Sequence, residues 1–196
     1  MLDRRAVLRI VIAFLLAIVF WSAFSRPYER VLARSAELVL RAFERPAVTR
    51  LEAVSPGFRV ERRDFPPGSP RPGLPAADLH FNFVLLVSLF ALDPRPWESQ
   101  RVARLLLALL LLFLVHVAAL VIQVQSVYAT ALGPWSAARY GTVARNIWGG
   151  GFHFYQIAGR FAAPFAIWWP LRRAERVEEP EAPRRARRGR KKRRKG

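Results

Sequence analysis

Four polar side chains fall within strongly apolar stretches of this sequence, and their types could support chemistry inside a membrane. They are Asn82, His116, Gln156 and Arg160. Amide and imidazole groups can bridge helices or line a polar path, whereas a guanidinium in apolar surroundings needs a partner or a route to an interface. Because such groups are rare in membranes and usually face protein or water, we predict that these four contact a partner protein or line a polar path.

A structural role competes with each of these functional interpretations. A single histidine such as His116 can be a neutral group that bonds to a neighbouring helix, and Arg160 can extend its charge toward an interface. Gln123 and Gln125 follow His116 closely. We predict that these two glutamines mark the outer end of the apolar segment.

The sequence offers little for catalysis. It contains no GxSxG, P-loop or HExxH motif and no cysteine, and its apolar segments carry no paired carboxylates. Three scattered histidines without carboxylates at ligand spacing do not predict a metal site. We therefore predict a protein that is not an enzyme and that needs neither a cofactor nor a metal ion.

The C-terminal segment 172–196 is polybasic and has no apolar periodicity, which predicts a disordered tail. Clusters of Lys and Arg attract anionic lipids and bind nucleic acid phosphates without sequence specificity. The tail has no aromatic side chain that could stack on bases. The candidate lipid contacts are Arg184, Arg185, Arg187, Arg188, Arg190, Lys191, Lys192, Arg193, Arg194 and Lys195.

The elements that would hold the polar residues are apolar segments of membrane-crossing length. The chain of 196 residues is 53% hydrophobic despite a net charge of +18, and its apolar residues are clustered. About 20 apolar residues are needed to cross a hydrocarbon core of ~30 Å. The predicted transmembrane helices are 1–24, 79–92, 102–124 and 151–171, of which 79–92 is short. The first has the basic start of a signal peptide, but its apolar run exceeds the usual ~7–15 residues, which favours a retained anchor.

The segments between the apolar stretches have their own patterns. Residues 27–45 have apolar positions three and four apart between two prolines, which predicts an amphipathic helix. Segment 46–78 contains two short alternating stretches and then many prolines, which predicts an extramembrane hairpin and a proline-rich loop. Segment 125–150 is moderately polar and is predicted to be an outer loop.

The distribution of basic residues predicts the orientation. Lys and Arg near membrane segments favour the cytoplasmic side, and the tail is the strongest such signal. Four membrane segments then put both termini in the cytoplasm. We predict a multi-pass protein of the bacterial inner membrane.

The last apolar segment, GFHFYQIAG followed by APFAIWW, and the order of segments resemble the exosortase H-associated family of small membrane proteins. The matching positions are Gln156, Gly159, Pro164 and Trp168. The stretch FNF lacks the proline expected after its asparagine, and the polybasic tail is a second departure from the family. The resemblance implies an accessory role beside a transpeptidase-like enzyme that processes the C-terminal anchors of exported proteins.

We therefore predict an all-α membrane protein with about four transmembrane helices, one amphipathic helix and a small extramembrane β-hairpin or loop segment. The predicted function is a non-enzymatic accessory subunit of a bacterial protein-sorting or export system, with another integral membrane protein as its partner. Two alternatives stay open. One is a small transport or permeation component, and the other is a membrane tether that holds anionic lipid or nucleic acid through its tail.

Overall fold

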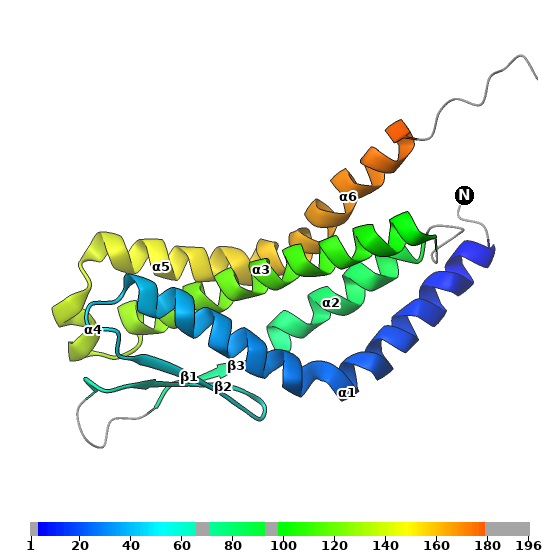
Figure 1. The fold of residues 1–196 in the computed structure, drawn as a ribbon. Coiled ribbons are helices and arrows are strands. Elements are labelled where there is room, and N and C mark those ends of the chain that lie inside the picture. The colour runs from blue at the N-terminus through cyan, green and yellow to red at the C-terminus, as the bar shows by residue number, and fades with distance from the viewer. Residues whose placement is uncertain (1–3, 66–70, 93–97, 179–196) are drawn as a thin grey trace, which may run out of the picture.

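The computed structural model describes residues 4–65, 71–92 and 98–178 (Figure 1). It is mostly helical and includes one small sheet. In chain order the elements are α1 (Arg4–Phe43), β1 (Thr49–Val54), β2 (Gly57–Arg62), β3 (Gly73–Pro75), α2 (Ala77–Phe90), α3 (Ser99–Thr130), α4 (Pro134–Arg139), α5 (Thr142–Phe154), the π-helix η1 (Tyr155–Gly159) and α6 (Arg160–Glu178).

Helix α1 joins two elements that the sequence predicted to be separate, the first transmembrane helix and the amphipathic helix. Its 40 residues run through Pro27 without a break, and the ribbon changes direction about halfway along (Figure 1). A proline inside a helix removes one hydrogen bond and bends the axis, but it does not have to end the helix. Packing of the second half stabilises the continuation, because Leu32, Ala36 and Leu40 are buried against the sheet and α3.

The hairpin predicted in segment 46–78 is present as β1 and β2, which pair antiparallel with Leu51 opposite Val60. A third strand, β3, pairs with β2 and comes from the segment predicted to be a proline-rich loop. Gly57 is required at this corner, because a Cβ there would collide with the carbonyl group of Leu74. Leu51, Phe58, Val60 and Leu74 form the inner face of the sheet in the main core.

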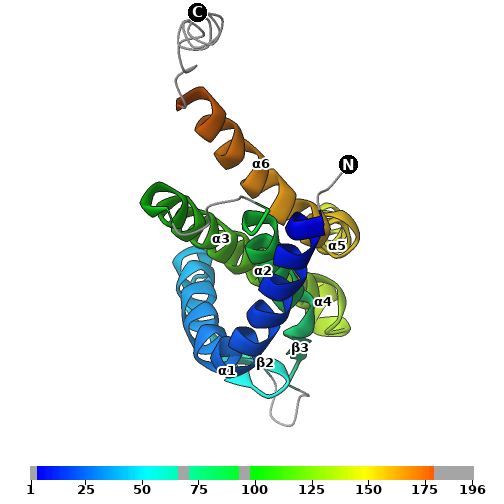
Figure 2. The same ribbon diagram turned by 90° about the vertical axis from the view of Figure 1, so that its right-hand side faces the viewer.

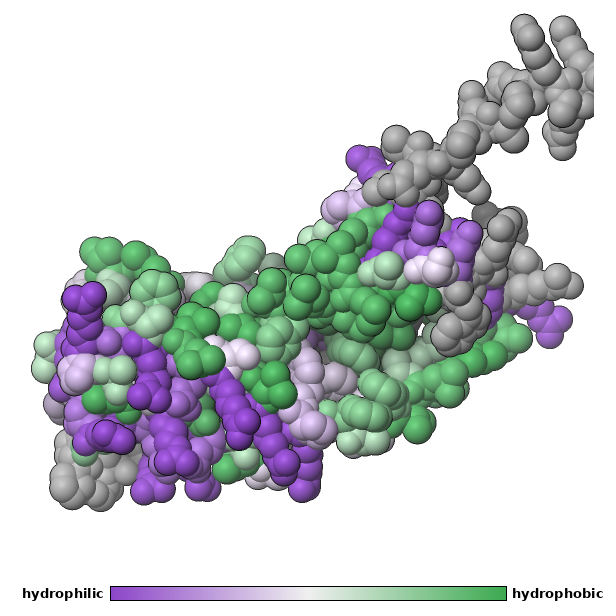
Figure 3. Space-filling model, viewed as in Figure 1, coloured by the Kyte–Doolittle hydropathy of each residue, from purple (hydrophilic) through white to green (hydrophobic). Residues whose placement is uncertain are grey.

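Two helices are long and apolar enough to cross a membrane, one within α1 over Val7–Phe43 and one at α3. Along α3 the exposed leucines occur between Leu106 and Leu114, and the residues from His116 onward are largely buried. Figure 3 shows the same division on the surface, with hydrophobic residues over one end of the molecule and hydrophilic residues over the sheet end. The sequence had predicted a uniform span over 102–124.

Segment 125–150 is helical rather than a loop. Helix α3 continues to Thr130, and α4 and α5 follow after short turns. Helix α5 lies close against the end of α3, because a Cβ added at Gly151 would contact Ile122 and one at Gly149 would contact Thr130. Gly149 and Gly151 therefore lie on the side of α5 that faces α3.

The predicted last span, 151–171, is divided among three elements: the end of α5, the π-helix η1 and α6. Helix α6 continues to Glu178, so residues 172–178, predicted to belong to a disordered tail, are helical. The rest of the predicted tail, with all ten candidate lipid contacts, lies outside the described residues.

Helix α2 lies between the other apolar helices. Val84 packs with Ala17 and Trp21 of α1, and Leu86 packs with Leu112 of α3 and with Trp168. The beginning of α1 and the end of α6 lie at one end of the molecule, and the sheet and α4 lie at the other (Figure 1). In the end-on view the last turns of α6 lean away from the bundle (Figure 2).

Candidate functional site

His116 is fully buried in α3 and meets a residue of α1 that the sequence did not single out. The distance from His116 Nδ1 to the phenol oxygen of Tyr28 is 2.5 Å. The ring of Tyr28 is held edge-on by Trp21 and Phe113. His116 is therefore a contact between two helices, and it lies where the exposed leucines of α3 end and its buried section begins.

Asn82 is fully buried in α2 and donates a hydrogen bond from Nδ2 to the phenol oxygen of Tyr155, at 3.2 Å. Tyr155 begins the π-helix, a wide turn that is rare and is often found at functional sites. A Cβ at Gly159 would come within 2.8 Å of the Tyr155 ring. Gly159 therefore provides the space in which the Tyr155 ring lies.

Gln156 and Arg160 contact each other one turn apart. Arg160 donates from Nη1 to Gln156 Oε1 at 3.4 Å, and its guanidinium lies 4.7 Å from the centre of the Phe161 ring. The guanidinium thus has polar and aromatic contacts within its own segment of chain.

The structure brings the four predicted residues into one region through two tyrosines. Tyr28 pairs with His116 and Tyr155 pairs with Asn82, while both tyrosine rings pack against the same core. Gln156 follows Tyr155 directly in the sequence. The four groups do not bond to one another except for Gln156 and Arg160. Both tyrosines are visible in the sequence, Tyr28 directly after Pro27 and Tyr155 within GFHFYQIAG. Neither stands out by type, because a tyrosine at an apolar stretch is an ordinary packing residue.

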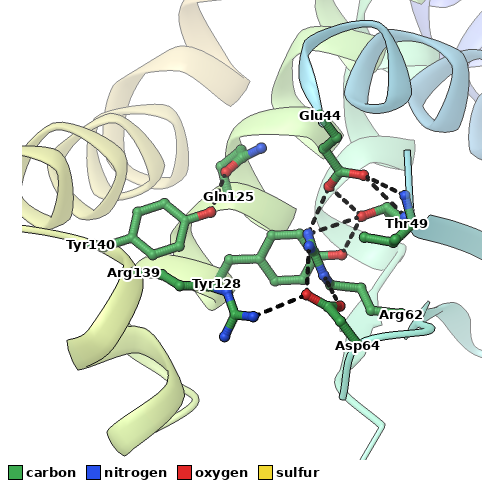
Figure 4. Close-up of polar contacts among 9 residues, drawn as sticks. Glu44, Thr49, Arg62, Asp64, Gln125, Tyr128, Arg139 and Tyr140 are labelled. Atoms are coloured by element: carbon green, nitrogen blue, oxygen red, sulfur yellow. Dashed lines mark hydrogen bonds and ion pairs between the residues drawn. The ribbon is translucent and has the colours of Figure 1, made fainter. Parts of the chain in front are cut away.

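A second polar cluster, which the sequence analysis missed, joins the sheet to the helix ends (Figure 4). Its centre is Glu44, just past α1, with a side chain only 10% exposed. The Glu44 carboxylate accepts hydrogen bonds from Arg62 Nη1 at 2.7 Å and from the Thr49 backbone at 3.0 Å. Thr49 Oγ1 also bonds to Glu44, and it lies 2.8 Å from the phenol oxygen of Tyr128 on α3. One carboxylate thereby fixes the corner between α1 and β1 and ties it to α3.

Arg62 extends this cluster toward α4. Its guanidinium lies 4.8 Å from the centre of the Tyr128 ring and 5.2 Å from that of Trp135. It also donates two hydrogen bonds to Asp64, from Nε at 2.8 Å and from Nη2 at 3.1 Å. Arg139 donates to the same carboxylate at 3.3 Å and lies over Trp135. The result is a layer in which two arginines, two carboxylates and two aromatic rings alternate.

These contacts perturb the ionisation of residues at the rim of the cluster. The hydrogen bond from Arg62 holds the pKa of Asp64 below its ordinary value, with a smaller contribution from the charge of Arg139. Burial raises the pKa of the Tyr140 phenol, and this hydroxyl donates to Gln125 Oε1 at 3.0 Å.

Gln123 and Gln125 differ from their predicted role as an outer boundary. Gln123 is buried and Gln125 bonds to Tyr140, so both face protein. Their helix continues beyond them for another turn. They face inward because α4 and α5 cover this end of α3. Both helices lie in the segment that the sequence predicted to be a loop.

The chemistry of both clusters is hydrogen bonding and charge pairing. The Glu44 and Asp64 carboxylates are each engaged by arginine. Within the described residues, no group of three or more His, Cys, Asp or Glu side chains could hold a metal ion. These contacts hold the sheet, α1 and α3 together as one rigid body.

Comparison with protein-family models, with curated proteins and with solved structures gives no match for this chain. The resemblance to the exosortase H-associated family stays a prediction.

Proposed function

We propose that this protein is a four-span accessory subunit of a bacterial protein-sorting or export system, of the exosortase-associated type, without catalytic activity of its own. The observation that carries the proposal is an exposed apolar face on α5, at the sheet end of the molecule.

The distribution of exposed apolar residues supports a membrane around the end of the molecule opposite the sheet. The part of α3 from Ser99 to His116 rises about 27 Å at ~1.5 Å per residue, close to the ~30 Å of a hydrocarbon core. The first half of α1 is exposed and apolar as far as Phe24. Helices α2 and α6 pack beside α3 at this level through Leu86, Leu112 and Trp168. In this arrangement His116 and Tyr28 lie at the membrane boundary.

The orientation follows from which ends lie together. The beginning of α1 and the end of α6 are at the membrane end of the molecule (Figure 1), which supports an even number of spans. The basic tail follows α6 directly, and positive charge favours the cytoplasmic side. Both termini are then cytoplasmic in the bacterial inner membrane, and the sheet, α4 and α5 lie outside.

Helix α5 presents an apolar face to its surroundings at the level of the sheet. Its exposed residues lie on one side at helical spacing: Val143 (73% exposed), Ile147 (63%), Phe154 (69%) and, in η1, Ile157 (75%). A contiguous apolar stripe outside the membrane marks an interaction site more strongly than scattered apolar residues do. The stripe continues into α6 as Phe161, Phe165 and Trp169, which are also exposed.

The continuity of the stripe supports an integral membrane protein as the partner. A surface that begins outside the membrane and continues at membrane depth is complementary to a protein that occupies both levels. Lipid alone would cover only the α6 part. The partner is therefore an integral membrane protein, and in the proposed system it is the sorting enzyme.

The test uses native membranes and a photo-crosslinking amino acid at Ile147 or, as the matched control, at Leu38. Leu38 is an equally exposed apolar residue (71%) on the second half of α1, away from α5. We expect crosslinks from position 147, and not from position 38, to one membrane enzyme that processes C-terminal anchors. We also expect Val143→Asp/Ile147→Asp to leave such anchors unprocessed, while Leu38→Asp supports normal processing. Equal crosslinking from both positions, or full processing with the double variant, would overturn the proposal.

A polar path is a second candidate, and one observation favours it. Asn82 Oδ1 is buried and has no hydrogen-bond partner among the described residues, so it can bind water or a small solute near Tyr155. The test is solute or proton leakage through reconstituted vesicles. Asn82→Leu should reduce leakage, and Ser88→Ala on the same helix, where the hydroxyl only bonds to the Val84 carbonyl at 2.7 Å, should not. Leakage equal to that of empty vesicles would exclude this candidate.

The tail adds an anchoring role at the cytoplasmic surface. Each Lys or Arg near an anionic membrane contributes about 1 kcal/mol of binding free energy. Deletion of residues 184–195 should weaken association with anionic vesicles and leave crosslinking at Ile147 intact. Loss of both together would mean that the tail is the main binding element of the protein.

A further inference from the structure

The second half of α1 carries three exposed arginines on one face, Arg26, Arg30 and Arg34. They follow one another at steps of four residues, so their side chains lie above one another along the helix. The row extends over about 12 Å at ~1.5 Å per residue. In the surface view, hydrophilic residues cover this half of the molecule and adjoin the hydrophobic end (Figure 3).

The same helical face is apolar before it becomes basic. Counting back from Arg26 by three and four residues leads to four exposed residues, Ala23, Val19, Leu16 and Ile12. Val19 and Leu16 each expose about two thirds of their surface (67% and 64%). Along one side of α1, an apolar strip therefore leads directly into a row of guanidinium groups.

Arg30 and Arg34 differ from Arg41 and Arg62, which each have a carboxylate partner. Arg41, further along α1, pairs with Glu37 at 3.2 Å, and Arg62 pairs with Glu44 at 2.7 Å. Among the described residues, neither Arg30 nor Arg34 has a carboxylate within ion-pair distance. Both guanidinium groups are exposed and are available to an anionic group from outside the chain.

The direction of the Arg30 and Arg34 side chains supports a site at the end of the apolar strip. Side chains of an α-helix lean toward its N-terminus, and in α1 the N-terminal direction leads to the apolar strip. The guanidinium groups of Arg30 and Arg34 are thereby directed toward the level at which the apolar strip ends. Guanidinium presents paired donors that match phosphate oxygens.

We infer that this face of α1 is a binding site for one anionic phospholipid, with the acyl chains along Leu16 and Val19 and the headgroup phosphate at Arg30 and Arg34. Arg26 lies at the start of the row, and its charge interacts with the carboxylate of Glu29. The site depends on the proposed membrane position but not on the proposed partner, which would bind α5. It is also separate in sequence from the polybasic tail, because α1 carries it and the tail follows α6.

The experiment measures lipid retention by the full-length protein in neutral detergent, using native mass spectrometry and added phosphatidylglycerol or phosphatidylcholine. The test variant is Arg30→Gln/Arg34→Gln. The control is Arg50→Gln/Arg59→Gln, which removes the same charge from two exposed positions of the sheet. All proteins keep the same tail, so its contribution cancels.

We expect the wild-type protein and the control to retain one tightly held phosphatidylglycerol, and the test variant to bind it about 30-fold more weakly because two charges are lost. Arg30→Lys/Arg34→Lys, which keeps the charge, should retain most of the binding and shows that loss is not a folding defect. Inorganic phosphate alone should not replace the lipid, because it lacks the acyl chains. The inference fails if the test variant and the control retain lipid equally, if phosphatidylcholine binds as tightly, or if inorganic phosphate displaces the lipid.

Discussion

The phenol oxygen of Tyr28 and Nδ1 of His116 lie 2.5 Å apart, although 88 residues separate them in the sequence. This contact joins α1 just after Pro27 to the middle of α3, and both residues lie where the exposed apolar sections of their helices end. The contact fixes how α1 and α3 are aligned along their lengths. It thereby also fixes how far the sheet lies from the apolar end of the molecule.

Replacing Tyr28 by Phe should lower the free energy of unfolding by about 1–3 kcal/mol, because it removes a hydrogen bond from the buried His116. In a thermal scan in detergent this corresponds to about 2–4 °C per kcal/mol for a chain of this size. Ser22→Ala is the matched control, since the exposed Ser22 hydroxyl only bonds to a carbonyl of its own helix at 2.7 Å. An equal effect of the two substitutions would mean that the Tyr28–His116 contact does not hold the helices together.

Gly159→Ala should displace the Tyr155 ring and weaken its hydrogen bond with Asn82, because a Cβ at residue 159 would lie 2.8 Å from that ring. We expect a loss of about 1–3 kcal/mol, the usual range for overpacking. Gly150→Ala is the control, since a Cβ at residue 150 has no atom within 4 Å. Alanine there should stabilise the helix by up to about 1 kcal/mol. Thermal unfolding of both variants tests the prediction, and a stable Gly159→Ala protein would contradict it.

Removing one partner of the buried Arg62–Glu44 pair should be strongly destabilising. Both side chains are only 10% exposed, and a buried charge left wholly without a partner costs about 3–5 kcal/mol. Arg62 keeps Asp64 as a second partner, so the loss for a Glu44 variant should fall below that range. Glu44→Gln is therefore expected to lower the melting temperature far more than Glu52→Gln. Glu52 belongs to an exposed pair with Arg50, a class that contributes about 0–1 kcal/mol. Similar melting temperatures for the two variants would show that the cluster is not a structural lock.

The Asp64 carboxylate should make stability depend on pH in the acidic range. Its pKa is lowered in the folded protein by the hydrogen bond from Arg62, so its contribution is fully present above the unfolded-state pKa of about 3.9. That contribution is lost as pH falls through the lower, folded-state pKa. The stability difference between wild type and Asp64→Asn should be constant from pH 7 to about pH 5 and shrink below about pH 4. Thermal scans across this range test it, and a difference that does not change would contradict the assignment.

Much of the fold was accessible to local patterns. The apolar runs predicted the membrane-length helices α1 and α3, and the alternation in segment 46–78 predicted the β1–β2 hairpin. These features depend on residues close together in sequence, so composition and periodicity are sufficient to find them. The polar residues of the candidate site were also found by type, because a buried amide or imidazole stands out in an apolar stretch.

The sequence by itself determined which segments are apolar, where the hairpin turns and which side chains are out of place in lipid-like surroundings. Only the tertiary structure decided that α1 continues through Pro27, because burial of Leu32 and Leu40 on distant elements stabilises the continuation. It also decided the partners, since Tyr28 reaches His116, Tyr155 reaches Asn82 and Arg62 reaches Glu44 across long stretches of chain. Such contacts depend on how whole elements pack, and no window of neighbouring residues contains that information. Gly149 and Gly151 show the same limit, because nothing in the neighbouring sequence indicates that they face α3.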